Sequence, residues 1–395
     1  MRSKVLPLLS LVTAVGLLRP EPAAAIPVFA RKYKVSCALC HNPIPKLTAF
    51  GEQFAANGFR FASNEAPRDT INTGDPLLQL ANQFPLAMRL EAYAQSYSGG
   101  RAATDFQTPY GLKILSSGTI SKKLSYYFYT FLAERGEIGG VEDAFLQVND
   151  IGGKPIDLVV GQFQVSDPLF KRELRLEFED YAVYRARLGD SPVDLTYDRG
   201  IVATADVAGF GLTGQLLNGN GAGGAESNRR FDQDPFKSVF FHISRDFGEN
   251  LHLGTFGYTG KTESGGVGSR TRMFGIDATI GGKTFELNGQ YIHRSETRPT
   301  FTANELEAVL DGGFAELIVR PPKSRWYGFG LYNLVSADRP LLNVRLGGPT
   351  GVNRYETMSA GFGRAEQRNF RWTLEATYDV KQETLRWGLG FVTAL

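Results

Sequence analysis

The chain has 395 residues, with 43 Lys and Arg against 41 Asp and Glu and a formal net charge of +2. Because the numbers of basic and acidic residues are nearly equal, the charge gives no reason to expect a nucleic acid as partner. After the N-terminal stretch, no apolar run is long enough for a transmembrane helix, which needs about 20 residues. A membrane β-barrel is not excluded, because its lipid-facing residues occur only at every second position.

The N-terminus has the features of an export signal. Arg2 and Lys4 give a basic start, an apolar stretch follows at 5–18, and the alanines at 23–25 form a small-residue cleavage site. The apolar stretch is short for a membrane anchor. We therefore predict that residues 1–25 are removed and that the protein works outside the bacterial cytoplasm.

Cys37, Cys40 and His41 form the Cys-x-x-Cys-His signature of c-type haem attachment. The spacing lets both thiols reach the two vinyl groups of one porphyrin, and the adjacent imidazole can then take the proximal position on iron. A structural zinc site would need further ligands, but the chain has no other cysteine and its next histidine is His242. We therefore predict one covalent haem as cofactor, bonded to Cys37 and Cys40, with His41 on the iron.

A short helix is predicted after Pro45, and its apolar face consists of Leu47, Phe50 and Phe54. Such a face can cover a porphyrin, because a stretch this short cannot otherwise build a core. The alternative is a helix packed on the following domain. The polar stretch 60–83 is expected to be a tether. Residues 26–83 are thus predicted to be a small haem segment and its tether.

Beyond residue 84 the chain alternates apolar and polar side chains in stretches of about ten residues, as membrane barrel strands do. In the predicted strand 370–379, the apolar face includes Leu374 and the polar face includes Arg371 and Glu375. Strands of a soluble sandwich are usually shorter. We expect Leu374 to face lipid, and Arg371 and Glu375 to face a lumen where substitutions are better tolerated.

Short and long connections alternate along this region. Short turns are predicted at 116–118, 151–155, 208–210, 248–250, 281–282, 321–324 and 365–368. Longer loops are predicted at 98–106, 134–140, 166–200, 218–235, 260–270, 295–309 and 337–353. This alternation is typical of periplasmic turns and external loops in an outer-membrane barrel. The count predicts sixteen antiparallel strands over 84–395, with both ends of the barrel in the periplasm.

The longest of these loops contains a charge-dense run at 171–187. It can form a solvated helix or fold inward and narrow the pore. The preceding Gly161-Gln162-Phe163, with the long segment 166–200, resembles the strand and constricting third loop of phosphate-selective-type porins. The elements 198–201 (Asp-Arg-Gly-Ile) and 217–219 (Leu-Asn-Gly) are similar to those porins as well.

The segment FARKYKVSCALCHNPIPKLTAFGEQFAANGFRF resembles the haem segment of fused outer-membrane monohaem c-type cytochrome–porins, a family that includes outer-membrane iron oxidases. The shared elements, in the same order, are Phe29-Ala30-Arg31, the haem motif, Pro45-x-Leu47 with Phe50-Gly51, and Gly58-Phe59. The resemblance implies a haem protein in the outer membrane that exchanges electrons with an extracellular donor such as ferrous iron.

The sequence does not single out a distal iron ligand. Alternation places His242 and His252 on the lumenal side of their strands, and Met88 and His293 on the outer side. His242, His252 and Met88 are candidates for the distal ligand. For the two lumenal histidines the alternative is a pore-lining role, and a water ligand or an open position is equally compatible with the sequence.

These features predict an all-β fold: a sixteen-stranded antiparallel transmembrane barrel with a small N-terminal α-helical c-type haem plug. The haem is expected in the lumen or at the periplasmic mouth. The predicted function is electron transfer between an extracellular redox partner and a periplasmic electron carrier, as a carrier or as an iron-oxidising oxidoreductase. One alternative is a transport porin plugged or regulated by the small cytochrome. Another is a haem sensor or peroxidase-like enzyme.

Overall fold

The computed structural model describes residues 28–61, 65, 67, 70–78, 80–82, 84–98, 104–226 and 228–395. The predicted export signal, residues 1–25, lies outside the described residues. None of the described helices is long and apolar enough to cross a bilayer.

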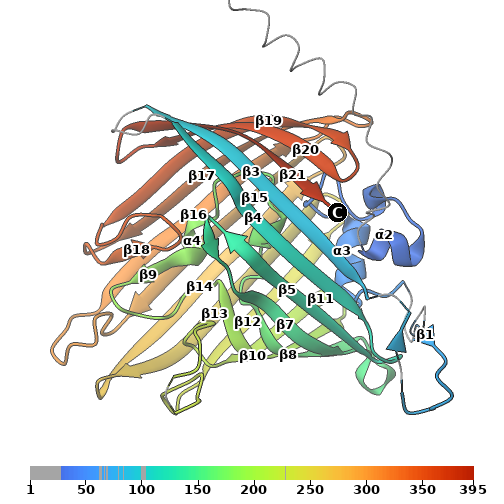
Figure 1. Cartoon of the computed structure of the whole chain (residues 1–395). Coiled ribbons are helices and arrows are strands. Elements are labelled where there is room, and N and C mark those ends of the chain that lie inside the picture. The colour runs from blue at the N-terminus through green and yellow to red at the C-terminus, as the bar shows by residue number, and fades with distance from the viewer. Residues whose placement is uncertain are drawn as a thin grey trace, which may run out of the picture.

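Sixteen long strands close into one antiparallel barrel (Figure 1), as the sequence predicted. Their bounds are β3 (Leu86–Ser98), β4 (Thr104–Thr119), β5 (Leu124–Glu134), β7 (Val141–Val148), β8 (Ile156–Gln164), β10 (Tyr197–Val207), β11 (Phe210–Leu217), β12 (Ser238–Phe247), β13 (Leu251–Ser264), β14 (Val267–Gly281), β15 (Phe285–Glu296), β16 (Ala308–Val319), β17 (Trp326–Ala337), β19 (Arg354–Gln367), β20 (Phe370–Asp379) and β21 (Thr384–Ala394). The two-residue β6 (Glu137–Ile138) extends the β5 hairpin.

The barrel closes where β21 pairs with β3, with Leu389 opposite Ala94. Closure leaves no unpaired strand edge, which a lipid environment requires because it offers backbone groups no water. Side chains alternate as expected: Arg371 and Glu375 of β20 are each 2% exposed inside the barrel, whereas apolar side chains such as Phe274 cover the outside. The outer surface is thus apolar and the inner surface polar.

The connections follow the predicted alternation, with two corrections. The first turn lies at 120–123, because β4 continues through the predicted turn at 116–118. The predicted loop 260–270 is also wrong: β13 and β14 extend through it and are joined by Gly265 and Gly266 alone. Both glycines have positive φ, as a two-residue hairpin turn requires. This hairpin is rich in polar residues because neither of its faces needs to be apolar. Its sequence therefore resembles that of a loop.

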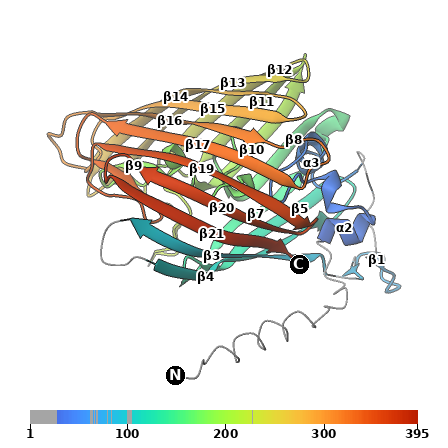
Figure 2. The same ribbon diagram turned by 90° about the horizontal axis from the view of Figure 1, so that it is seen from above.

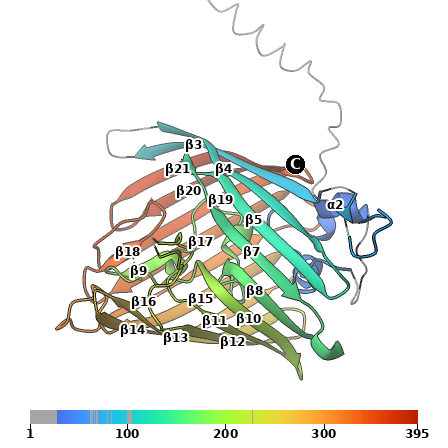
Figure 3. The same ribbon diagram turned by 60° about the horizontal axis from the view of Figure 1, so that its bottom comes forward.

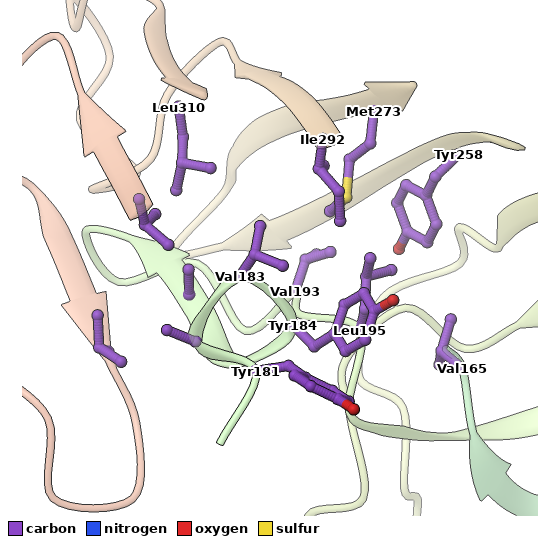
Figure 4. Close-up of a cluster of buried hydrophobic side chains, with 14 of the residues drawn as sticks. Val165, Tyr181, Val183, Tyr184, Val193, Leu195, Tyr258, Met273, Ile292 and Leu310 are labelled. Carbon is purple, nitrogen blue, oxygen red and sulfur yellow. The ribbon is translucent and has the colours of Figure 1, made fainter. Parts of the chain in front are cut away.

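The segment between β8 and β10 folds into the lumen, which decides between the two interpretations of its charge-dense run. It forms η3 (Arg172–Leu174), the single helical turn α4 (Ala182–Arg185) and β9 (Ala186–Leu188). β9 pairs with β18 (Leu342–Val344) from the connection between β17 and β19 (Figure 3). Tyr184 and Leu195 of this inward loop pack in the main hydrophobic cluster, against inward side chains such as Ile292 and Met273 (Figure 4).

The N-terminal segment lies at the end of the barrel that carries the short turns and the C-terminus (Figure 2). It forms α2 (Val28–Tyr33), η1 (Cys37–Leu39) and α3 (Ala49–Ala56). The predicted tether contains a small hairpin of β1 (Thr70–Ile71) and β2 (Leu80–Ala81). Because short turns mark the periplasmic end of such barrels, this segment occupies the periplasmic mouth.

Candidate functional site: the Cys-x-x-Cys-His segment at the barrel mouth

The two cysteines are held by one short helical turn. The hydroxyl of Ser36 accepts a hydrogen bond from the Ala38 amide and caps η1. The amides of Cys40 and His41 donate to the Cys37 carbonyl at 3.2 and 2.8 Å, which closes the turn. Residues three apart share one side of a helical turn, so the two thiols belong to one side of η1. Both are free and half-buried.

The orientation of the His41 imidazole is fixed by the backbone. Its Nδ1 donates to the Pro45 carbonyl at 2.9 Å, which leaves the Nε2 lone pair available to a metal. Burial lowers the pKa of His41, so the ring is neutral at neutral pH. A neutral imidazole with an engaged Nδ1 is the state that an axial iron ligand needs. The donor set therefore fits a c-type haem.

Helix α3 crosses this turn at very close range. A Cβ at Gly51 would lie 2.3 Å from the Cys40 carbonyl oxygen, so only glycine permits the approach. Thr48 caps α3 by accepting from the Gly51 amide, and its own hydroxyl donates to the Leu39 carbonyl at 2.7 Å. These contacts give a physical reason for the glycine of the Phe50-Gly51 element.

An aromatic cluster fills the rest of the segment. Phe54 is 6% exposed and meets Phe29 edge-on at 5.1 Å, while Phe59 stacks on Phe29 at 5.2 Å. Phe59 also stacks at 5.0 Å on Tyr127 of β5. The helix face predicted after Pro45 thus contributes Phe54 to the segment's own apolar core. The same core contacts the barrel wall through Phe59, whereas the covering of a porphyrin by this helix face stays a prediction.

Polar contacts hold the segment in the mouth. Lys46 forms an ion pair of 2.7 Å with Glu286, and Arg320 donates to the Asn42 carbonyl at 2.9 Å. Arg60, only 1% exposed, forms an ion pair of 3.1 Å with Asp150. The sequence did not reveal the burial of Arg60, because nothing in a polar stretch distinguishes a buried arginine from an exposed one.

Helix α3 also borders the barrel interior. A cavity of about 590 Å³ lies between it and the lumen wall, with Glu52 and Gln53 on one side and Gln215 and His242 on the other. The side-chain amide of Gln147 donates to the Ala56 carbonyl at 3.0 Å. The segment therefore both covers the mouth and reaches into the lumen.

A second cavity, of about 610 Å³, opens among the external loops and includes Arg135, Arg185 and Arg386. Its floor is the inward loop, in which Asp180 forms ion pairs with Arg185 and two further arginines. Glu375 holds this loop by accepting from the Phe178 and Glu179 amides at 2.7 and 3.1 Å. Arg371 also holds the loop, by donating to the Leu176 carbonyl. The contacts therefore indicate that substitutions at Glu375 and Arg371 disturb the inward loop, whereas the sequence leads us to expect that they are better tolerated.

The distal-ligand candidates lie as alternation predicted. His242 faces the lumen with Nε2 3.0 Å from an Asp277 carboxylate oxygen, and His252 faces it with Nδ1 2.7 Å from Asp246. Met88 alternates with Arg89, whose ion pairs are inside, so Met88 is on the outer face. His293 packs outside against Phe274. Which residue, if any, binds iron distally stays a prediction.

Comparison with known proteins bears on the barrel. No family model and no curated protein matches the sequence. Similar solved structures include an anion-selective porin from Comamonas acidovorans, at 9% identity and a TM-score of 0.57, with 79% of this chain and 99% of that one covered. A loop-deletion form of the outer membrane protein OmpT of Vibrio cholerae matches at 11% identity and a TM-score of 0.54, with 79% and 99% covered.

The outer membrane channel DcaP of Acinetobacter baumannii is similar too, at 9% identity and a TM-score of 0.53, with 78% of this chain and 96% of that one covered. At such identities the likeness shows the fold alone, and that fold is a bacterial outer-membrane, porin-type β-barrel. The porins are covered almost whole, whereas part of this chain lies outside the likeness. The predictions of fold class and outer-membrane location are confirmed; those of haem and electron transfer stay predictions.

Proposed function

We propose that this porin-type barrel carries one c-type haem at its periplasmic mouth and transfers electrons between an extracellular redox partner and a periplasmic carrier. One observation carries the proposal: His41 has its Nδ1 engaged by the Pro45 carbonyl, directly beside two free thiols. A Cys-x-x-Cys that only forms a disulfide does not require an adjacent imidazole whose Nε2 is left available to a metal.

Each residue has a defined task in this proposal. Cys37 and Cys40 would anchor the porphyrin, and His41 would bind the iron through Nε2. Phe54 and its aromatic neighbours exclude water from one side of the segment. The group held there supplies a one-electron redox centre, and the protein supplies position, burial and axial ligation.

The position suits transfer across a membrane. A bilayer's hydrocarbon core is about 30 Å thick, so a centre wholly outside it could not serve both surfaces. The segment is exposed at the periplasmic end, while α3 borders a cavity inside the lumen. The second cavity gives the external side a path down to the inward loop. A redox site in the mouth of the barrel would therefore lie closer to the external partner than one held wholly outside the bilayer, and it would still be accessible to the periplasmic carrier.

The test is the double change Cys37→Ser/Cys40→Ser, with Ala49→Ser at the exposed start of α3 as control. Covalent haem staining after denaturing electrophoresis should be lost, while the barrel still inserts because its strand pairing uses neither cysteine. Liposomes should lose transmembrane electron transfer and keep or gain solute flux. Electron transfer by the haem-free barrel would refute the proposal.

The second candidate is a transport porin that the N-terminal segment plugs or regulates. The fold favours it, since the solved structures most like this barrel include an anion-selective porin and an outer membrane channel. The segment is also held across the mouth by ion pairs. If flux is substantial in the native protein and stops when haem is removed, this function takes precedence.

A further inference from the structure

The turns at the periplasmic end are strongly basic. Seven exposed side chains in them carry positive charge: Lys122, Lys123, Lys154, Lys283, Lys323, Arg325 and Arg368. Among described residues none of the seven has an ion-pair partner. Strictly between the strand ends, the turns contain two acidic residues, of which Asp150 is engaged by Arg60 and Glu249 is left; Glu366, at the end of β19, pairs with Arg364. We call the seven residues the basic rim.

The basic rim borders the haem motif. The Lys122 carbonyl accepts from the Arg60 guanidinium at 3.0 Å, so this turn touches the N-terminal segment directly. The turn that carries Lys323 and Arg325 also touches this segment, since Arg320 at its start donates to the Asn42 carbonyl at 2.9 Å. Lys34, exposed between α2 and η1, adds a further positive charge at the same place.

The external end lacks this bias. In the described part of the loop between β11 and β12, Arg229 and Arg230 stand among acidic residues, and Lys237 pairs with Asp232. In the last external turn Lys381 lies two residues from Glu383. The near-zero charge of the whole chain therefore conceals a polarity along the barrel axis.

We propose that the basic rim is the docking surface for a soluble periplasmic electron-carrier protein with an acidic face. The redox role of this partner rests on the proposed function; its acidic character follows from the rim alone. Clustered charge of one sign attracts an oppositely charged protein and raises association rates by about 10–1,000-fold at low ionic strength. Anionic lipid headgroups also attract lysines. The contacts of the Lys122 carbonyl and of Arg320 with the N-terminal segment favour the protein, since they place two of the basic turns at the mouth.

The test compares two variants with equal loss of charge. The rim variant is Lys123→Gln/Arg325→Gln/Arg368→Gln, and the control is Arg229→Gln/Arg230→Gln/Lys381→Gln at the external end. The binding probe is a polyglutamate peptide, measured against haem-containing protein in detergent and against the Cys37→Ser/Cys40→Ser form. We expect binding that weakens with salt, falls about tenfold in the rim variant and is unchanged in the control.

A redox probe reports the charge at the haem edge itself. Reduced protein gives one electron to hexacyanoferrate(III), which becomes hexacyanoferrate(II). Because this oxidant is anionic, its rate should fall as ionic strength rises, and the rim variant should be slower by several-fold at low ionic strength only. A cationic cobalt(III) tris-phenanthroline oxidant should show the opposite salt dependence.

The two proposals can fail separately. If haem is absent yet polyglutamate still binds through the rim, the proposed function falls and the acidic docking surface stands. Equal loss of polyglutamate binding in rim and control variants overturns the docking surface. The docking surface is also overturned if polyglutamate binding is lost in liposomes that contain phosphatidylglycerol but kept in phosphatidylcholine liposomes. The rim would then bind anionic lipid headgroups.

Discussion

Replacing Arg60 by leucine should release the N-terminal segment from the barrel mouth. The Arg60 side chain donates four hydrogen bonds, of which two reach the barrel: one to the Lys122 carbonyl at 3.0 Å and one to Asp150 at 3.1 Å. A charge-assisted hydrogen bond contributes about 1.5–3 kcal/mol. Since the Asp150 side chain is 20% exposed and can regain water, the lower end applies, and the two together give about 3 kcal/mol.

A loss of about 3 kcal/mol should raise the population of undocked segment about 100-fold. Hydrogen exchange measured by mass spectrometry in micelles should therefore become much faster in peptides from α3, with barrel strands unaffected. Lys154→Leu, in the same turn as Asp150 but exposed and without an ion pair among described residues, is the matched control. If α3 exchanges as slowly in Arg60→Leu as in the native protein, these contacts do not hold the segment and the docking argument is wrong.

Three further outcomes are expected. Leu374→Arg, on the lipid-facing side of β20, should reduce the unfolding free energy in lipid by about 2–4 kcal/mol, as measured by denaturant titration; an unchanged value would contradict the assigned face. Glu375→Leu should free the inward loop from the Phe178 and Glu179 amides, and single-channel recording should then show larger or noisier conductance, while Thr377→Val serves as a milder neighbour. The third concerns pH. Because burial lowers the pKa of His41 below its ordinary 6.5, the haem-free segment should be fully stable above that pH and lose stability as pH falls below it, whereas His41→Gln should remove this dependence when α3 exchange is followed from pH 7 to 5.

The barrel could be predicted because a lipid environment imposes a strict pattern on the sequence. Each strand must present apolar residues to lipid and polar ones to the lumen, so an alternation as long as that of residues 370–379 is typical of a membrane barrel strand. Turn positions were less well determined. A polar hairpin such as β13–β14 beyond the membrane obeys no such pattern, and its strands were taken for a loop.

Of the candidate haem site, the sequence indicated the three residues whose chemistry is in the motif and an apolar helix face beside them. Cys37, Cys40 and His41 are recognisable because attachment requires thiols and an imidazole at fixed spacing. The Pro45 carbonyl that orients His41 belongs to the backbone, which has no residue signature. The same is true of the Cys40 carbonyl that forbids a side chain at Gly51.

By itself, the sequence determined the strand count and the orientation of strand faces, and it predicted an export signal and a haem-attachment motif, because each depends on local residue order. Only the tertiary structure decided that the charged run 171–187 folds inward, that Arg60 is buried against Asp150, and that the lysines of separate turns form one basic rim. These features join residues far apart in the chain. Their energies depend on which side chains closure of the barrel brings together, and no stretch of sequence records that.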